Sequence, residues 1–452
     1  MMGINSREGA AGSNMEAIGF RQRTTANIRD AAHRTFQSLE IRDFRILWWG
    51  FMGSWVGMQM QQVARGYLAY QLSGNALGLG LVTLAMGLPR IVFSPYGGVL
   101  ADRFPKRTVL LWTQAALSLF ALGQALLLAT HLMTIEWLIV FGFFQGLAFS
   151  FNMPARQAYL PAIVGRGNGL ANAVALNSAG MNLTRVAGPA VAGILIAAPF
   201  FGVTGVFFLV ALCYVWVWWS VFRVENPGRP EGLRRGAGRS IGDGFRYVLR
   251  RPALLALMSL GFIPLAIGMP YINLMPVVAI HDLNVGAVGL GVLLSVGGIG
   301  SLAGTLMVAY LAQYPHKARL QLAFGVVFGL SLLAFAVAIW KGTILEAVPW
   351  LFVVGVSGDA YMALNSSLIM LNTETGVYGR VMGVYMMAQS IRPLSILPIS
   401  AVADAIGTPL TFVGAGGIVA AFVLGVATFY PGYRRIGETG ETGAKPPRQA
   451  GV

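Results

Sequence analysis

The sequence is poor in cysteine, histidine and charge. Its one cysteine, Cys213, lies in an apolar run, which excludes a disulfide framework and a cysteine-ligated metal cluster. The four histidines are scattered without the spacing of metal ligands. The chain contains no nucleophile elbow and no GxxxxGK[ST] phosphate loop, which argues against hydrolase chemistry and ATP-driven pumping. We therefore expect a protein that is not an enzyme and that holds no metal or cofactor.

Charged residues make up only 11% of the chain, against about 25% in soluble domains. Hydrophobic residues make up 56%, and the mean hydropathy is +0.66. A membrane-spanning helix needs ~20 apolar residues, and the apolar runs predict an all-α integral membrane protein with twelve transmembrane helices. The predicted spans cover residues 45–70, 78–101, 107–130, 135–154, 170–198, 201–222, 253–280, 286–312, 318–340, 347–371, 378–404 and 408–430.

Lysine and arginine are concentrated in alternate loops of this pattern. The basic clusters fall in the first 45 residues, at 103–107, 223–251 and 317–319, and after 433. This is the positive-inside bias, which predicts a multi-pass protein of the bacterial plasma membrane with both termini in the cytoplasm. The net charge of +15 then reflects membrane topology, and no nucleic-acid partner is expected.

The composition divides the chain into five parts. The first 40 residues are polar and rich in arginine, without a cleavable signal peptide, and the segment 28–44 has the pattern of an interfacial helix. Residues 225–251 are rich in proline, glycine and arginine and read as a linker. The predicted parts are a cytoplasmic tail at 1–44, a six-helix bundle at 45–222, a cytoplasmic linker at 223–252, a second six-helix bundle at 253–430 and a cytoplasmic tail at 431–452.

The two halves resemble each other. The fifth span of each half carries an amide three residues before an arginine, in "NLTRVAGP" (Asn182, Arg185) and "AQSIRPLS" (Gln389, Arg392). Two related six-helix halves are typical of transporters whose binding site lies near the midplane between them.

The stretch "GGVLADRFPKRTVL" (97–110) places paired glycines and four ionisable residues in a short turn between two spans. Gly97 and Gly98 allow another helix to approach closely. Asp102, at a helix end, can pair with an arginine or with the positive N-terminus of a neighbouring helix. The turn is therefore either a contact that is made and broken as two bundles move, or a plain positive-inside turn.

This turn resembles the loop signature of the major facilitator superfamily, roughly G-x-L-A-D-R-x-G-R-K/R-x-x-L. Pro105 replaces the usual glycine, and the matching positions are Gly98, Leu100, Ala101, Asp102, Arg103, Lys106, Arg107 and Leu110. The resemblance implies two pseudo-symmetric six-helix bundles and a cytoplasmic gate. The residues assigned to that gate are Gly98, Asp102, Arg103, Arg107, Glu374 and Arg380.

Further stretches resemble the branch that contains the enterobactin exporter and macrolide efflux proteins. They are "IRDFRILWWG", "PARQAYLPAIV", "NAVALNSAGMNLTRVAGPAVAG" and "GRVMGVYMM". The resemblance implies secondary active transport, usually proton-driven export. "GPAVAG" is also similar to the antiporter signature, which implies a helix bend at Gly188, Pro189 and Gly193; the alternative is a small-residue helix contact.

Polar residues form stripes on several predicted spans. Met58, Gln61, Gln62 and Arg65 share one helical face, and Arg90 lies in mid-span. Because lipid excludes such side chains, we expect them to face a cavity or to hold the bundle together. The residues predicted to line a substrate cavity are Gln61, Gln62, Arg65, Arg90, Asn182, Arg185, Tyr385, Gln389 and Arg392.

Asp359 is the one carboxylate that the pattern places in the middle of a span. Burial raises the pKa of a carboxyl group and a nearby arginine lowers it, so such a group can load and release a proton. Asp359 is therefore the candidate for proton coupling. The alternative is a static salt bridge to Arg185 or Arg392.

The excess of arginine over carboxylate favours an anionic or polar-headed substrate, and methionine and aromatic residues suit an apolar body. The sequence therefore predicts a monomeric, proton-coupled exporter of an amphipathic or anionic small molecule, such as a siderophore, a drug or a lipid-like metabolite. The alternatives are an uptake carrier or lysolipid flippase on the same fold, and a membrane sensor that does not transport.

Overall fold

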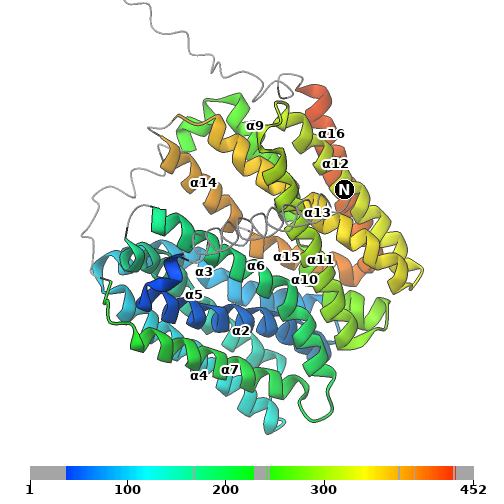
Figure 1. Ribbon diagram of the computed structural model, residues 1–452. Helices are drawn as coiled ribbons and strands as arrows, with labels where there is room; N and C mark the ends of the chain where they lie inside the picture. Colours follow the sequence, from blue (N-terminus) through cyan, green and yellow to red (C-terminus); the bar gives the residue numbers. More distant parts are fainter. Residues whose placement is uncertain are drawn as a thin grey trace, which may run out of the picture.

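The computed structural model describes residues 37–165, 168–228, 242, 245–374, 377–390, 392–430 and 433. The regular elements of this part of the chain are all helical (Figure 1). The first half contains the short helix η1 (Gln37–Glu40) and α2 (Arg42–Ser73), α3 (Ala76–Arg103), α4 (Lys106–Ala129), α5 (Ile135–Val164), α6 (Asn168–Ala197) and α7 (Gly202–Arg223). The predicted interfacial helix at 28–44 lies mostly outside the described residues.

The second half begins with α9 (Pro252–Ile263), η2 (Pro264–Gly268), α10 (Tyr271–Val277) and η3 (Val278–Asp282). It continues with α11 (Gly286–Tyr310), η4 (Leu311–Gln313), α12 (Lys317–Trp340), α13 (Ile344–Leu371), α14 (Tyr378–Ser390), α15 (Arg392–Ile406) and α16 (Thr408–Phe429). The predicted twelve-helix membrane fold is confirmed, but the seventh span is not one regular helix. It contains two π-helical turns, η2 and η3, because Pro264, Pro270 and Pro276 cannot donate backbone hydrogen bonds.

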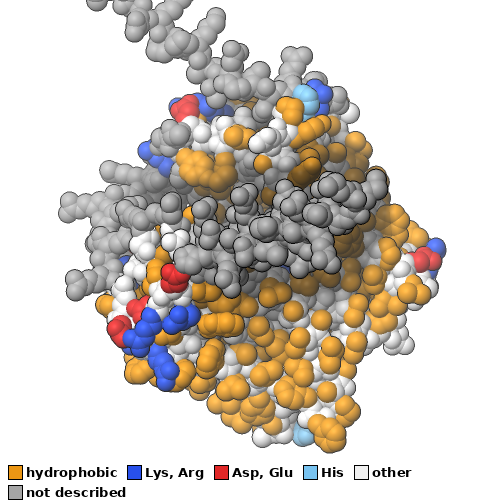
Figure 2. All heavy atoms as spheres, in the orientation of Figure 1, with side chains coloured by type: hydrophobic (Ala, Val, Ile, Leu, Met, Phe, Trp, Pro, Cys, Tyr) orange, Lys and Arg blue, Asp and Glu red, His pale blue; other side chains and the backbone are white. Residues whose placement is uncertain are grey.

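Ten helical segments of the described chain are long and apolar enough to cross a membrane. The other two predicted spans are α2, whose four polar side chains Gln59, Gln61, Gln62 and Arg65 lower its hydropathy, and the α14–α15 pair. Residue 391, between α14 and α15, lies outside the described residues. The face turned to the viewer in Figure 2 is largely apolar, and large side chains such as Trp112, Leu119 and Leu212 are exposed on the surface, as lipid contact requires.

Glycines bring the helices of each half into backbone contact. A Cβ atom at Gly146 of α5 would lie 2.1 Å from the carbonyl oxygen of Met86 on α3. The equivalent helices of the second half repeat this crossing, since a Cβ atom at Gly304 of α11 would lie 2.2 Å from the carbonyl oxygen of Val356 on α13. The second and fourth spans of each half therefore cross in the same way. The resemblance between the two halves of the sequence thus corresponds to the same helix packing in the two bundles.

The two bundles contact each other through the ends of the helices that lie far from Arg223 and Pro252. Near that far end, Gly193 of α6 packs against Gly291 of α11, and Gly80 of α3 packs against Ser400 of α15. Gly66 of α2 packs against Pro276 of α10 in the same region. We call this end the far end and the opposite one the linker end. In Figure 1, α3 and α6 of the first bundle lie below α9 and α14 of the second.

Candidate functional site

Two adjoining cavities lie between the bundles. Their volumes are about 270 Å³ and about 390 Å³, and we call them the first and second cavity. The residues that line both are Met58, Gln62, Val63, Ile272, Leu294 and Arg392. Residues of both bundles line each cavity, so a movement of one bundle against the other changes the shape of both cavities.

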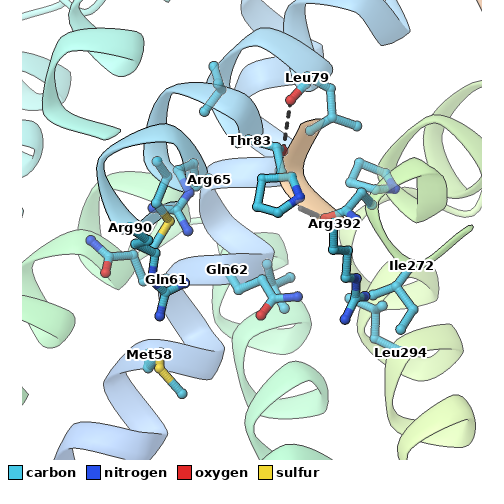
Figure 3. Close-up of a pocket in the computed structure, with 18 residues that line it drawn as sticks. Met58, Gln61, Gln62, Arg65, Leu79, Thr83, Arg90, Ile272, Leu294 and Arg392 are labelled. Carbon is cyan, nitrogen blue, oxygen red and sulfur yellow. Dashed lines mark hydrogen bonds between the residues drawn. The ribbon is translucent and has the colours of Figure 1, made fainter. Parts of the chain in front are cut away.

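The first cavity is rich in arginine. Arg65 of α2 and Arg90 of α3 come from the first bundle, and Arg392 of α15 comes from the second. In Figure 3, Arg65 and Arg90 lie together with Gln61 on one side, Arg392 lies on the other, and Gln62 lies between them. The acidic side chains of the described residues contribute nothing to its lining. The first cavity is therefore a positively charged site.

A chain of buried amides holds Arg65 in place. Its Nη1 donates to Oε1 of Gln145 at 3.2 Å, and Nε2 of Gln145 donates to Oε1 of Gln124 at 3.0 Å. Nε2 of Gln61 donates to the same Gln124 oxygen at 3.4 Å, and the hydroxyl of Tyr214 donates to Gln61 at 2.9 Å. Neutral groups thus orient the guanidinium and leave its charge uncompensated.

The second cavity contains an ion pair that crosses from one bundle to the other. Nη2 of Arg185, on α6, lies 2.9 Å from Oδ2 of Asp359, on α13. The same nitrogen donates to the hydroxyl of Ser301 on α11 at 3.2 Å. A Cβ atom at Gly298 of α11 would lie 3.2 Å from the carbonyl oxygen of Arg185, so this glycine allows α6 and α11 to approach. Both charged side chains keep partial access to the cavity, with 40% and 23% of their surface exposed.

The structure therefore brings together six of the nine residues predicted to line the cavity: Gln61, Gln62, Arg65, Arg90, Arg185 and Arg392. The other three lie elsewhere. Asn182 and Gln389 are half-buried outside both cavities, and Tyr385 is buried in the core of the second bundle, where it faces Gly261. Tyr385 shares a helical face with Arg392 in the sequence, but its ring packs into the core of the second bundle and lines neither cavity.

The predicted gate residues of the 97–110 turn lie at the linker end. Asp102 and Arg103 are exposed, and no described residue pairs with either of them. A Cβ atom at Gly98 would have no neighbour within 4 Å. Arg107 instead donates to the carbonyl oxygens of Val221 and Phe222 at the end of α7, within its own bundle. No hydrogen bond or ion pair joins these residues to a described residue of the second bundle.

The other two gate candidates lie at the linker end of the second bundle. Glu374 pairs with Arg251, just before α9, and Arg380 lies in the first turn of α14. The predicted bend residues lie in α6, which runs unbroken from residue 168 to residue 197. Gly188 packs against Gln59 of α2, and Gly193 packs against α11, so both glycines form helix contacts.

Sequence reasoning missed a contact that joins the bundles at the far end. Oδ1 and Oδ2 of Asp404, near the end of α15, accept hydrogen bonds from the backbone N–H groups of Ala76 and Leu77 at 2.6 and 2.8 Å. The carboxylate thereby caps the N-terminus of α3. A helix-terminal aspartate before a glycine was the only signal in the sequence, and it does not identify a partner 328 residues away.

A family model described as transmembrane secretion effector matches residues 33–433. The chain is 24% identical to the staphyloferrin A transporter of Staphylococcus aureus, over 80% of this chain and 89% of that protein. It is 26% identical to the enterobactin exporter of Citrobacter koseri, over 78% and 81% of the two chains. It is 22% identical to a macrolide efflux protein of Streptococcus pyogenes, over 83% and 93%.

The fold is similar to that of a bacterial homologue of the human lysosomal transporter Spinster, solved in an inward-facing and occupied conformation. The TM-score is 0.69 at 12% identity, over 86% of this chain and 97% of that one. At this identity the likeness concerns the fold alone. Together with the sequence relatives, it confirms the predicted resemblance and identifies a multi-pass membrane transporter, not an enzyme.

Proposed function

Because the chain belongs to the transmembrane secretion effector family of the major facilitator superfamily, we propose that it is a proton-coupled exporter of an amphipathic or anionic small molecule. Its relatives include proteins named for siderophore transport and drug efflux. The observation that carries the proposal is the ion pair between Arg185 and Asp359, which joins the bundles inside a cavity.

Alternating access is supported by the unequal contacts at the two ends. At the far end, Asp404 caps α3 and small residues of both bundles touch. At the linker end, Asp102 has no partner among the described residues. The positive-inside bias assigns the linker end to the cytoplasm. In this proposal the conformation is closed to the outside and accepts substrate from the cytoplasm.

The ion pair offers a mechanism for exchange. An anionic group of the substrate competes with Asp359 for Arg185, which releases the two bundles from each other and lets the far end open. When the substrate leaves outward, a proton takes its place as the neutralising partner by binding Asp359. On return, the approach of Arg185 favours the carboxylate, and the proton leaves to the cytoplasm. One substrate thus leaves as one proton enters.

The predicted division of the chain fits this proposal. Helices α2–α7 and α9–α16 are the two moving bodies, and the linker at 223–252 and the tails at 1–44 and 431–452 lie on the cytoplasmic side. Each cavity is enclosed within one chain, so a monomer is sufficient. The boundaries, the orientation and the monomeric state are parts of the proposal.

Transport by inside-out vesicles tests the function. A thermal-shift screen of the purified protein with catecholates, lysolipids and common antibiotics identifies a ligand, and its uptake is then measured with and without a proton gradient. Asp359→Asn should abolish gradient-driven uptake at normal expression. The matched control is Glu346→Gln, which removes an exposed carboxylate paired with Lys341 and should leave uptake unchanged.

The outcomes separate the alternatives. Accumulation in whole cells but not in inside-out vesicles would indicate an uptake carrier, and movement of lysolipid between leaflets would indicate a flippase. A ligand that binds but is not transported in either direction would indicate a sensor. Equal gradient-driven uptake by the Asp359→Asn variant would contradict proton coupling through this residue.

A further inference from the structure

Positive charge greatly exceeds negative charge in the interior of the helices. Between residues 45 and 222 the sequence has two acidic residues, Asp102 and Glu136, which lie in the last turn of α3 and the first turn of α5. In the second bundle, Asp359 is already paired with Arg185. The arginines that lie away from the ends of the membrane spans, with α14 and α15 taken as one span, are Arg65, Arg90, Arg156, Arg185 and Arg392.

Isolated charges within a bilayer are costly, so an excess of this kind requires a counterion. Arg156 lines neither cavity: its guanidinium lies over the rings of Phe51 and Trp55, 3.7 and 4.5 Å from their centroids. Arg65, Arg90 and Arg392 remain, and all three line the first cavity. An anion that neutralises these three arginines would therefore bind in the first cavity.

Neutral groups hold two of these three arginines. Arg65 is hydrogen-bonded to Gln145, and the guanidinium of Arg90 lies 5.3 Å from the centroid of the Phe149 ring. The guanidinium of Arg392 makes no hydrogen bond or ion pair with any described residue. None of the three is neutralised, and two of them stand on α2 and α3 while the third stands on α15 of the other bundle.

We propose that the first cavity binds the head of a polyanion, an organic molecule that carries at least two carboxylate or phosphate groups. Arg65 and Arg90 bind one anionic group and Arg392 binds another, each through the paired N–H groups that suit planar or tetrahedral oxyanions. This inference rests on the proposed transport function and specifies its substrate class.

The second cavity extends this site toward apolar side chains. Trp55, Met181, Met275 and Leu293 line it beside the ion pair. Since Arg392 lines both cavities, a head bound to it places the rest of the molecule against that apolar wall. The bound polyanion is thus amphipathic, and it bridges the two bundles as the ion pair does.

Calorimetric titration of the full-length protein in a neutral detergent tests the proposal. The probe is tricarballylate, which has three carboxylates, and it is compared with its trimethyl ester and with acetate at equal ionic strength. We expect binding of tricarballylate only. Arg392→Gln and Arg65→Lys should each weaken binding about tenfold, the loss of one charge-assisted contact. Arg223→Gln, at a surface arginine stacked on Trp219, should leave it unchanged.

Equal binding of the ester, or no binding of tricarballylate above that of acetate, would overturn the proposal. So would unchanged affinity in Arg392→Gln, a substitution that leaves no described hydrogen-bond partner unsatisfied. Nanodiscs distinguish the source of the anion: if phosphatidylglycerol displaces tricarballylate where phosphatidylcholine does not, a lipid headgroup occupies the site, which contradicts its use by a soluble substrate. Gradient-driven export that depends on Asp359 would survive any of these results.

Discussion

The two bundles share their packing but differ in their interior charge. The glycine crossing of α3 with α5 is repeated by α11 with α13. The first bundle, however, holds four arginines and no carboxylate away from its helix ends, whereas the second holds Arg392 and Asp359. The two halves therefore share the helix packing that each bundle needs to fold. Their polar residues differ: the first bundle mainly supplies arginines that attract an anion, and the second supplies the carboxyl group of Asp359.

Reversing the charge of Arg185, which forms the ion pair between the bundles, should have the largest effect. Arg185→Asp places two carboxylates in the second cavity, and we expect it to abolish transport of the ligand identified by screening. The double variant Arg185→Asp with Asp359→Arg restores opposite charges and should recover part of the activity. Uptake by inside-out vesicles measures both. A double variant as inactive as the single one would mean that the ion pair does not act as a unit.

The shared packing predicts equal losses of stability in the two halves. Gly146→Ala and Gly304→Ala each force a methyl group against a backbone carbonyl, which should cost about 1–3 kcal/mol of unfolding free energy. Gly417→Ala is the control, because a Cβ atom there meets nothing within 4 Å. Thermal unfolding in detergent measures all three. A loss in only one half would show that the crossings are not equivalent.

The amide network belongs to the first bundle alone. Gln145→Leu removes the acceptor of Arg65 and the donor to Gln124, both buried, and should cost about 1–3 kcal/mol. It should also weaken binding of a polyanion, since Arg65 loses its orientation. The exposed Gln71→Leu is the matched control. Unchanged binding in a folded Gln145→Leu variant would show that the network does not position Arg65.

The contact at the far end should give the smallest effect. Asp404→Asn keeps the size of the side chain but removes the charge that caps α3. Because the site is exposed, we expect the free-energy difference between the closed and open states of the far end to change by no more than about 1 kcal/mol. Accessibility of a cysteine introduced at Leu77 to a membrane-impermeant reagent reports opening of this end. A labelling rate equal to that of the parent would show that Asp404 does not hold it closed.

Much of the fold could be predicted because lipid imposes long apolar helices and because the halves repeat. The pattern of α2 placed Gln61, Gln62 and Arg65 on one face, and the structure places all three beside a cavity. The alternative partner named for Asp359, Arg185, is the one that it contacts. Residues whose polar side chains share one face of a continuous helix were therefore the easiest to assign to the cavity.

The remaining features depend on packing between distant helices. Tyr385 was assigned to the cavity by extending one helical face along the eleventh span, but its ring packs beside Gly261 in the core of the second bundle. Gln124 and Gln145 look ordinary in sequence, and only the crossing of α4, α5 and α2 brings them to Arg65. The role of Asp404 depends on the contact between α15 and the start of α3, which no local pattern encodes.

The most direct test is the distance across the linker end, measured by electron–electron double resonance. Spin labels are attached to cysteines introduced at Val99 and Leu371, which are exposed on opposite bundles, after Cys213 is replaced by serine. Asp359→Asn removes the charge that holds Arg185 and should shift the distances toward shorter values, whereas the control Glu346→Gln should keep those of the parent. A distance distribution in Asp359→Asn equal to that of the parent would contradict the account.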